Sequence, residues 1–151
     1  MKKHFHPLSA ISGIFPSHSK KGLEPGSLLH TGKKKMGKIH IQLLEYDEKN
    51  SIEKEISSNS LPDLSKNKLQ WLSISGLHDT KLLETIGNKY GLHSLLLEDI
   101  LNTNGRPKLD EIEDVILIVV KILKFDEANN NLSIEQISLI FGKDFVLSFQ
   151  E

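Results

Sequence analysis

Alternation of apolar and polar residues predicts two β-strands in the first half of the chain. Residues 38–44 place Ile39, Ile41 and Leu43 on one face of an extended segment, which is the period of a half-buried strand. Residues 70–75 alternate in the same way and end at a glycine. The intervening stretch 46–59 is highly charged, and its pattern leaves a short helix and a loop open.

Apolar residues recur at helical spacing between positions 82 and 90, which predicts a helix with one buried face. Asp79 or Thr80 is the expected N-cap, because short polar side chains accept hydrogen bonds from the first free N–H groups. Gly91 is suited to the left-handed residue that ends many helices.

A second, shorter helix is predicted over residues 95–101. Ser94 is its expected N-cap. Residues 102–107 contain asparagines, a glycine and a proline, and such residues end a helix.

The last third of the chain is strand-like. The stretch 115–123 is rich in β-branched residues and nearly all apolar, which predicts a central strand buried on both faces. Two further apolar runs, 137–141 and 145–149, flank a three-residue turn that begins with Gly142, the pattern of a hairpin. We therefore expect an α/β (α+β layered) fold, with a central mixed sheet of about six strands flanked by helices.

Composition then excludes several classes of protein. The chain has 151 residues and no cysteine, so disulfides, thiolate nucleophiles and cysteine-ligated metal sites are ruled out. The longest apolar run spans six residues, from Val115 to Val120. A membrane-spanning helix needs about 20 apolar residues, so the sequence contains no such helix.

Charge divides the chain into two parts. The first 38 residues carry eight lysines and one glutamate, a net charge of +7, whereas the whole chain has a net charge of −1. We therefore expect a largely irregular, basic N-terminal tail over 1–37 and an acidic α/β domain over 38–151. An acidic body with 6% aromatic residues does not suit nucleic-acid binding. Because the sequence stops directly after a predicted strand, we expect it to be part of a longer protein.

The most informative polar residues are two adjacent acids on the second predicted helix, Glu98 and Asp99. Neighbouring helical residues point about 100° apart, so at most one of them shares the buried leucine face. A carboxylate at the edge of an apolar face needs a positive partner. Arg106, Lys108 or a hard divalent cation such as Mg²⁺ could supply it, and the residues alone favour a salt bridge.

Other candidate sites are less complete. The four carboxylates within residues 110–114 would lie on two faces of a strand. His78 beside Asp79 suggests an acid–base pair, but no nucleophile accompanies it. The basic stretch 32–39 has P-loop-like spacing without the hydroxyl that holds Mg²⁺. His4 and His6 make an incomplete metal site.

Several motifs, in this order and spacing, resemble the CorA family of magnesium and cobalt transporters. They are Trp71-Leu-Ser-Ile-Ser-Gly-Leu-His78, Leu92-His-Ser-Leu-Leu-Leu-Glu-Asp-Ile-Leu-Asn102 and Arg106-Pro-Lys108. A Pro-Gly…Thr-Gly segment within 25–32, the apolar stretch 115–123 and the two C-terminal strands extend the likeness, so that it covers roughly residues 26–151.

The resemblance implies properties that the composition does not reveal. Family members are homopentameric channels of the inner or plasma membrane, with a cytoplasmic α/β domain, a stalk helix and two membrane helices that follow it. This sequence is similar to the first part of the cytoplasmic domain. In the family, regulatory Mg²⁺ between neighbouring subunits keeps the pore closed. The ligands of that ion and of a second ion match Asp99 and Glu98, respectively, and Co²⁺ is a further possible ion.

The resemblance thus implies a cation-sensing domain on the cytoplasmic face of a membrane, and not an enzyme. Three alternatives remain open. The first is a zinc-transporting relative of the same fold, and the second is a stand-alone soluble α/β binding module. The third is a hydrolase that uses His78 and Asp79.

Overall fold

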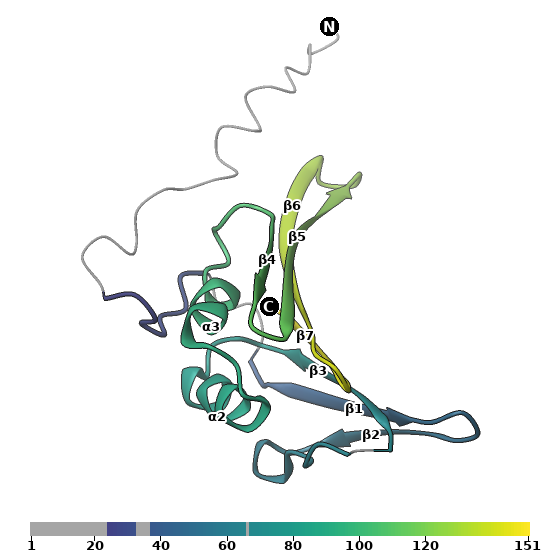
Figure 1. The fold of residues 1–151 in the computed structure, drawn as a ribbon. Coiled ribbons are helices and arrows are strands. Elements are labelled where there is room, and N and C mark those ends of the chain that lie inside the picture. Colours follow the sequence, from purple (N-terminus) through teal and green to yellow (C-terminus); the bar gives the residue numbers. More distant parts are fainter. Residues whose placement is uncertain (1–23, 33–36, 66) are drawn as a thin grey trace, which may run out of the picture.

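A seven-stranded mixed sheet with two helices on one of its faces forms the core of the fold (Figure 1). The computed structural model describes residues 24–32, 37–65 and 67–151. The α/β fold class is confirmed, with one strand more than expected. The strands are β1 (His40–Tyr46), β2 (Ser51–Ile56), β3 (Leu69–Ser75), β4 (Lys108–Ile112), β5 (Val115–Asp126), β6 (Asn131–Phe141) and β7 (Phe145–Gln150). The helices are the 3₁₀ turn η1 (Ser58–Ser60), α2 (Thr80–Tyr90) and α3 (Ser94–Leu101).

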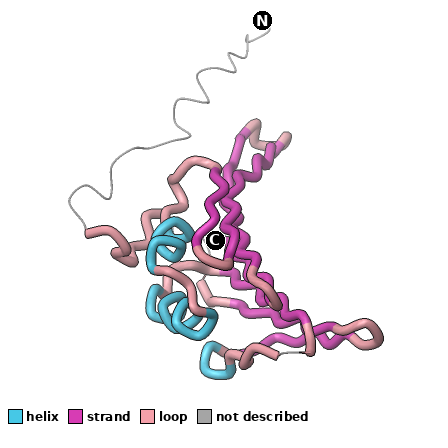
Figure 2. Tube along the Cα trace, in the orientation of Figure 1, coloured by secondary structure: helices cyan, strands magenta, loops and turns pink. Residues whose placement is uncertain are grey.

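The strand order is β2-β1-β3-β7-β6-β5-β4, and only the β3–β7 pair is parallel. The β6–β7 hairpin predicted around Gly142 is confirmed. Figure 2 shows that α2 and α3 lie on the same side of the sheet. The main core fills the space between these helices and the sheet. Its largest fully buried side chains are Phe149, Leu43, Leu72, Ile74, Leu77, Leu83, Ile86, Leu96, Ile100, Leu101, Leu117 and Ile140.

The charged stretch 46–59, which the sequence left open between a short helix and a loop, contains a turn at 47–50, an edge strand over 51–56 and the start of the 3₁₀ turn η1. β2 pairs with β1 in antiparallel register, and five of its six residues are exposed. The Asp47 carboxylate accepts N–H bonds from Lys49 and Asn50, both at 2.8 Å, and so shapes the turn. An edge strand needs no apolar face, and its charges discourage pairing with other chains.

The helix ends follow the sequence closely, with one correction. Asp79 caps α2 by accepting a hydrogen bond from Leu82 N–H at 3.0 Å, and Gly91 is left-handed with φ of 66°. The prediction that Ser94 caps the second helix is wrong. His93 is the N-cap, because its Nδ1 accepts from Leu95 N–H at 3.2 Å and the helix already begins at Ser94.

The prediction that residues 115–123 form a central strand buried on both faces is also wrong. β5 is the second strand from the edge, and only Leu117 and Val119 are buried. Ile116 and Val120 point to the opposite face and are 40% and 37% exposed. The physical reason is that the helices cover one face of the sheet only, so an apolar strand does not imply burial on both sides.

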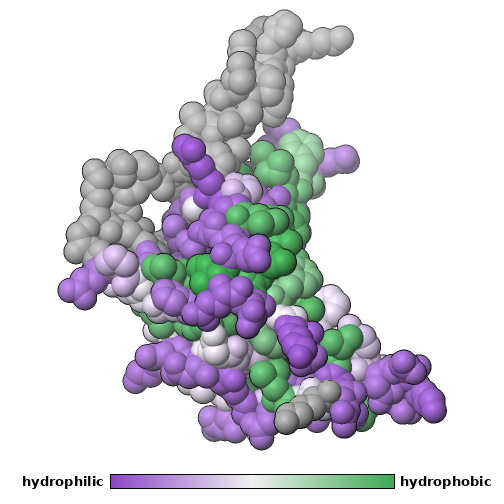
Figure 3. All heavy atoms as spheres, viewed as in Figure 1, coloured by the Kyte–Doolittle hydropathy of each residue, from purple (hydrophilic) through white to green (hydrophobic). Residues whose placement is uncertain are grey.

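Apolar surface gathers along β4 to β6 in the view of Figure 3, whereas the β1–β2 hairpin is mostly hydrophilic. Within the described ranges, no helix is both long and apolar enough to cross a membrane.

Candidate functional site

Helix α3 carries the two acids that the sequence singled out. Leu96, Leu97, Ile100 and Leu101 are buried against the sheet and α2. This apolar face fixes the rotation of the helix, so Glu98 and Asp99 are half-buried at the edge of the contact. The edge position expected from helical geometry is therefore confirmed.

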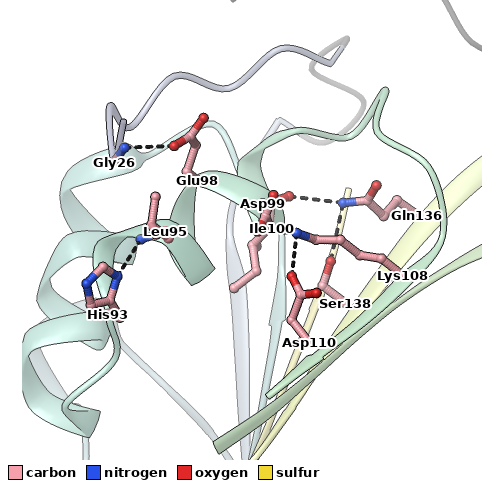
Figure 4. A network of polar contacts seen from close by, with 10 residues as sticks. All are labelled: Gly26, His93, Leu95, Glu98, Asp99, Ile100, Lys108, Asp110, Gln136 and Ser138. Atoms are coloured by element: carbon pink, nitrogen blue, oxygen red, sulfur yellow. Dashed lines mark hydrogen bonds and ion pairs between the residues drawn. The ribbon is translucent and has the colours of Figure 1, made fainter. Parts of the chain in front are cut away.

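Asp99 forms the salt bridge that the sequence favoured, and its partner is Lys108 rather than Arg106. The Lys108 ammonium donates to Asp99 Oδ2 at 2.5 Å and lies 2.6 Å from Asp110 Oδ2 (Figure 4). Lys108 and Asp110 are two residues apart on β4, so their side chains share one face. Burial disfavours the charged ammonium, but hydrogen bonds and charges from Asp110 and Asp99 outweigh burial and raise the pKa of Lys108. Lys108 therefore stays charged at neutral pH.

Glu98 points to a different partner. Its Oε2 accepts the backbone N–H of Gly26 at 2.7 Å (Figure 4). The same N-terminal segment, residues 24–32, continues along the helix, where Thr31 N–H donates to Leu101 O at 3.2 Å. This segment contains no helix or strand. Glu98 thus ties an irregular segment to α3, while the domain boundary at residue 38 stays a prediction.

A polar clamp made by Lys121 and Gln136 holds the C-terminal end of α3. Gln136 Nε2 donates to Ile100 O at 3.1 Å, and Lys121 Nζ donates to Thr103 O at 2.6 Å. The two side chains also contact each other, with Lys121 Nζ donating to Gln136 Oε1 at 2.8 Å. Neither residue was predicted as part of the site. The available signal is weak, because Lys121 interrupts the apolar run of β5, whereas Gln136 is one of several polar residues in β6.

The carboxylate of Asp99 is chemically suited to be one ligand of a hard cation. Carboxylate oxygens are the ligands that Mg²⁺ prefers, usually one or two together with water. Asp99 offers such oxygens and is 28% exposed. Across the ranges 24–32, 37–65 and 67–151, no group of three or more His, Asp or Glu residues could hold a metal. The four acids of 110–114 therefore form no metal cluster, and a cation at Asp99 would need ligands from beyond the described residues.

His78 and Asp79, the other pair that the sequence suggested, both line one pocket of about 990 Å³. Asp79 also caps α2. The buried Nδ1 of His78 has no hydrogen-bond partner among the residues described. His4, His6, most lysines of the basic tail and residues 33–36 of the P-loop-like stretch lie outside the described residues.

Comparisons with known proteins agree on one family. The family model described as "CorA-like Mg2+ transporter protein" matches residues 66–151. A relative from Thermotoga maritima, "Cobalt/magnesium transport protein CorA", is 37% identical over 135 residues, which cover 88% of this chain and 38% of the relative. This chain therefore spans well under half of that relative's length.

Solved structures share the fold at low sequence identity. The soluble domain of CorA from Methanocaldococcus jannaschii is 18% identical with a TM-score of 0.53, covering 72% of this chain and 39% of that one. The full-length CmaX protein is 14% identical with a TM-score of 0.57, covering 80% of this chain and 36% of that one.

Proposed function

Because the chain belongs to the CorA-like Mg²⁺ transporter family, we propose that it is the cytoplasmic cation-sensing domain of a transporter of Mg²⁺ and Co²⁺. The T. maritima relative is named for these two ions. In this proposal the domain belongs to a homopentamer at the membrane, and its role is to regulate opening of the pore.

The observation that carries the proposal is the position of Asp99. Its carboxylate is partly exposed at the edge of a helix whose rotation the core fixes, so a group on a neighbouring subunit can approach it. A bound dication would supply positive charge between facing carboxylates. Asp99 would hold it, and Glu98 would contribute to a second ion. Losing the ion would leave like charges facing each other and favour the open state.

The donor chemistry favours Mg²⁺ over Zn²⁺. Zinc sites in proteins are built chiefly from cysteine and histidine. The chain has no cysteine, and the polar groups beside Asp99 are Lys108 and Asp110. For the transported ion, the support is the name of the T. maritima relative, which gives cobalt and magnesium, so a zinc-transporting relative of this fold is the weaker alternative.

The test is the substitution Asp99→Asn in the transporter that carries this domain. Removing one charged ligand should raise the Mg²⁺ concentration that half-inhibits transport by about tenfold, the loss expected for roughly 1.4 kcal/mol of ion binding. Uptake into vesicles loaded with graded Mg²⁺ measures this. Asp114→Asn is the matched control, because Asp114 is exposed in the β4–β5 turn and should leave inhibition unchanged. Equal inhibition in Asp99→Asn and the unmodified protein would overturn the proposal.

A further inference from the structure

We propose that Lys108 is a tethered competitor of the divalent cation at Asp99. Its ammonium neutralises Asp99 when no cation is bound, and a dication has to displace it from that carboxylate. This inference rests on the proposed function, since it describes how the Asp99 site is regulated.

The first support is the geometry around the ammonium. Lys108 Nζ contacts Asp99 Oδ2 on α3 and Asp110 Oδ2 on β4, both within hydrogen-bonding distance (Figure 4). Among the residues described, the ion pair with Lys108 is the polar contact that the structure gives the Asp99 side chain. The ammonium therefore occupies the position beside Asp99 that a cation would approach.

The second support is electrostatic. An ammonium and a dication in contact with the same carboxylate repel each other, and this repulsion is considerable where water is partly excluded. All three side chains are only partly exposed, at 34% for Lys108, 28% for Asp99 and 39% for Asp110. Binding of the dication to Asp99 must therefore displace the ammonium, or else repulsion between the two positive charges weakens binding.

The third support is that Lys108 has another carboxylate to hold it. Lysine is a compact charge with three donors on a flexible stem, so it can keep its contact with Asp110 while it releases Asp99. The ammonium then stays close to the site and returns to Asp99 when the dication leaves. The consequence is that a higher concentration of the dication is needed to occupy the site. When no dication is bound, the charge of Asp99 is still paired.

The experiment measures Mg²⁺ binding to the 151-residue chain itself. Amide resonances of Asp99 and Ile100 are followed by NMR as MgCl₂ is added at constant ionic strength. Lys108→Gln and Lys108→Met should bind Mg²⁺ about two- to fivefold more tightly than the unmodified chain, the worth of a partly exposed ion pair. Lys108→Gln keeps donors for both carboxylates, so it tests the inference even if Lys108→Met folds poorly. Lys108→Arg keeps the charge and should stay within twofold.

Lys89→Met is the matched control. Lys89 also pairs with an aspartate, since its Nζ lies 2.7 Å from Asp63 Oδ1, but that pair joins α2 to the loop before β3. The substitution Lys89→Met removes one positive charge, as Lys108→Met does, but at another place in the fold, and should leave the Mg²⁺ affinity unchanged. Equal affinity in Lys108→Gln and the unmodified chain, or no binding by either, would overturn the inference. An unchanged half-inhibiting Mg²⁺ concentration in the Asp99→Asn transporter would instead overturn the proposed function.

Discussion

The hydroxyl of Tyr90 is a single polar group that lowers the stability of the fold. This hydroxyl is buried and has no hydrogen-bond partner among the described residues, while the ring of Tyr90 packs edge-on against Phe145 with centroids 5.0 Å apart. A buried hydroxyl without a hydrogen-bond partner lowers the free energy of unfolding, because its desolvation is not compensated. The ring contact with Phe145 does not depend on the hydroxyl. We expect Tyr90→Phe to raise the free energy of unfolding by about 1 kcal/mol, as measured by urea denaturation. A lower free energy of unfolding would show that the hydroxyl has a partner.

The same variant has a signature at alkaline pH. Burial, followed by the negative charges of Glu45 and Asp63, raises the pKa of Tyr90 to about 12. The folded protein therefore holds this proton more firmly than the unfolded chain, whose tyrosines titrate near pH 10. The resulting stabilisation is fully present below pH 10 and is lost as pH rises towards 12. Absorbance at 295 nm should show a late ionisation step that Tyr90→Phe abolishes.

Individual contacts were predictable from sequence only where both partners lie close together in the chain. Asp99 and Lys108 are nine residues apart, and the need of an edge carboxylate for a positive partner was enough to name Lys108 as one of three candidates, beside Arg106 and a divalent cation. Glu98 and Gly26 are 72 residues apart. No periodicity or spacing links residues at that separation, because the chain path between them decides the contact.

At the scale of elements, the end of α3 depends on the strands beneath it. Lys121 from β5 and Gln136 from β6 donate hydrogen bonds to carbonyls at this end. We expect Lys121→Met to lower the free energy of unfolding by about 1.5–3 kcal/mol, the worth of hydrogen bonds to a charged group. Hydrogen exchange should also accelerate in the last turn of α3, which a purely global loss of stability would not single out.

Lys124→Met provides the control for that prediction. Lys124 lies on the same strand and pairs with Glu135, but its side chain is 62% exposed. Exposed ion pairs contribute little, so its loss should change the free energy of unfolding by less than about 0.5 kcal/mol. Equal effects of the two variants would contradict a specific clamp at α3.

Elements were predictable where a local pattern and local burial coincide. The helix caps at Asp79 and Gly91 satisfy local hydrogen-bond and backbone requirements, so the sequence identifies them. β2 has no such pattern, since an edge strand of charged residues takes its structure from pairing with β1. The apolar stretch in β5 wrongly predicted burial on both faces. Which face of a sheet is covered depends on where the helices pack, and the sequence of the strand does not determine that.

At the scale of the whole molecule, the candidate site is one part of a larger arrangement. The core fixes α3, and the residues around it bring Asp99 to the helix edge. Residue chemistry alone left these acids undecided between a salt bridge and a metal, and only the resemblance of the motifs to a transporter family implies a site shared between subunits. The described residues hold no cluster of three ligands, so a cation at Asp99 would need further ligands from beyond the described residues.

This dependence predicts a weak response of the isolated chain to Mg²⁺. One carboxylate that is already paired with Lys108 offers a dication a dissociation constant on the order of 10 mM, at which 10 mM MgCl₂ stabilises the fold by ~0.4 kcal/mol. The melting temperature should then rise by less than about 2 °C, as measured by calorimetry with ionic strength matched by KCl. A rise of more than about 5 °C that saturates below 1 mM would correspond to a complete structural site. That outcome would contradict the view that Asp99 binds its cation only together with ligands from another subunit.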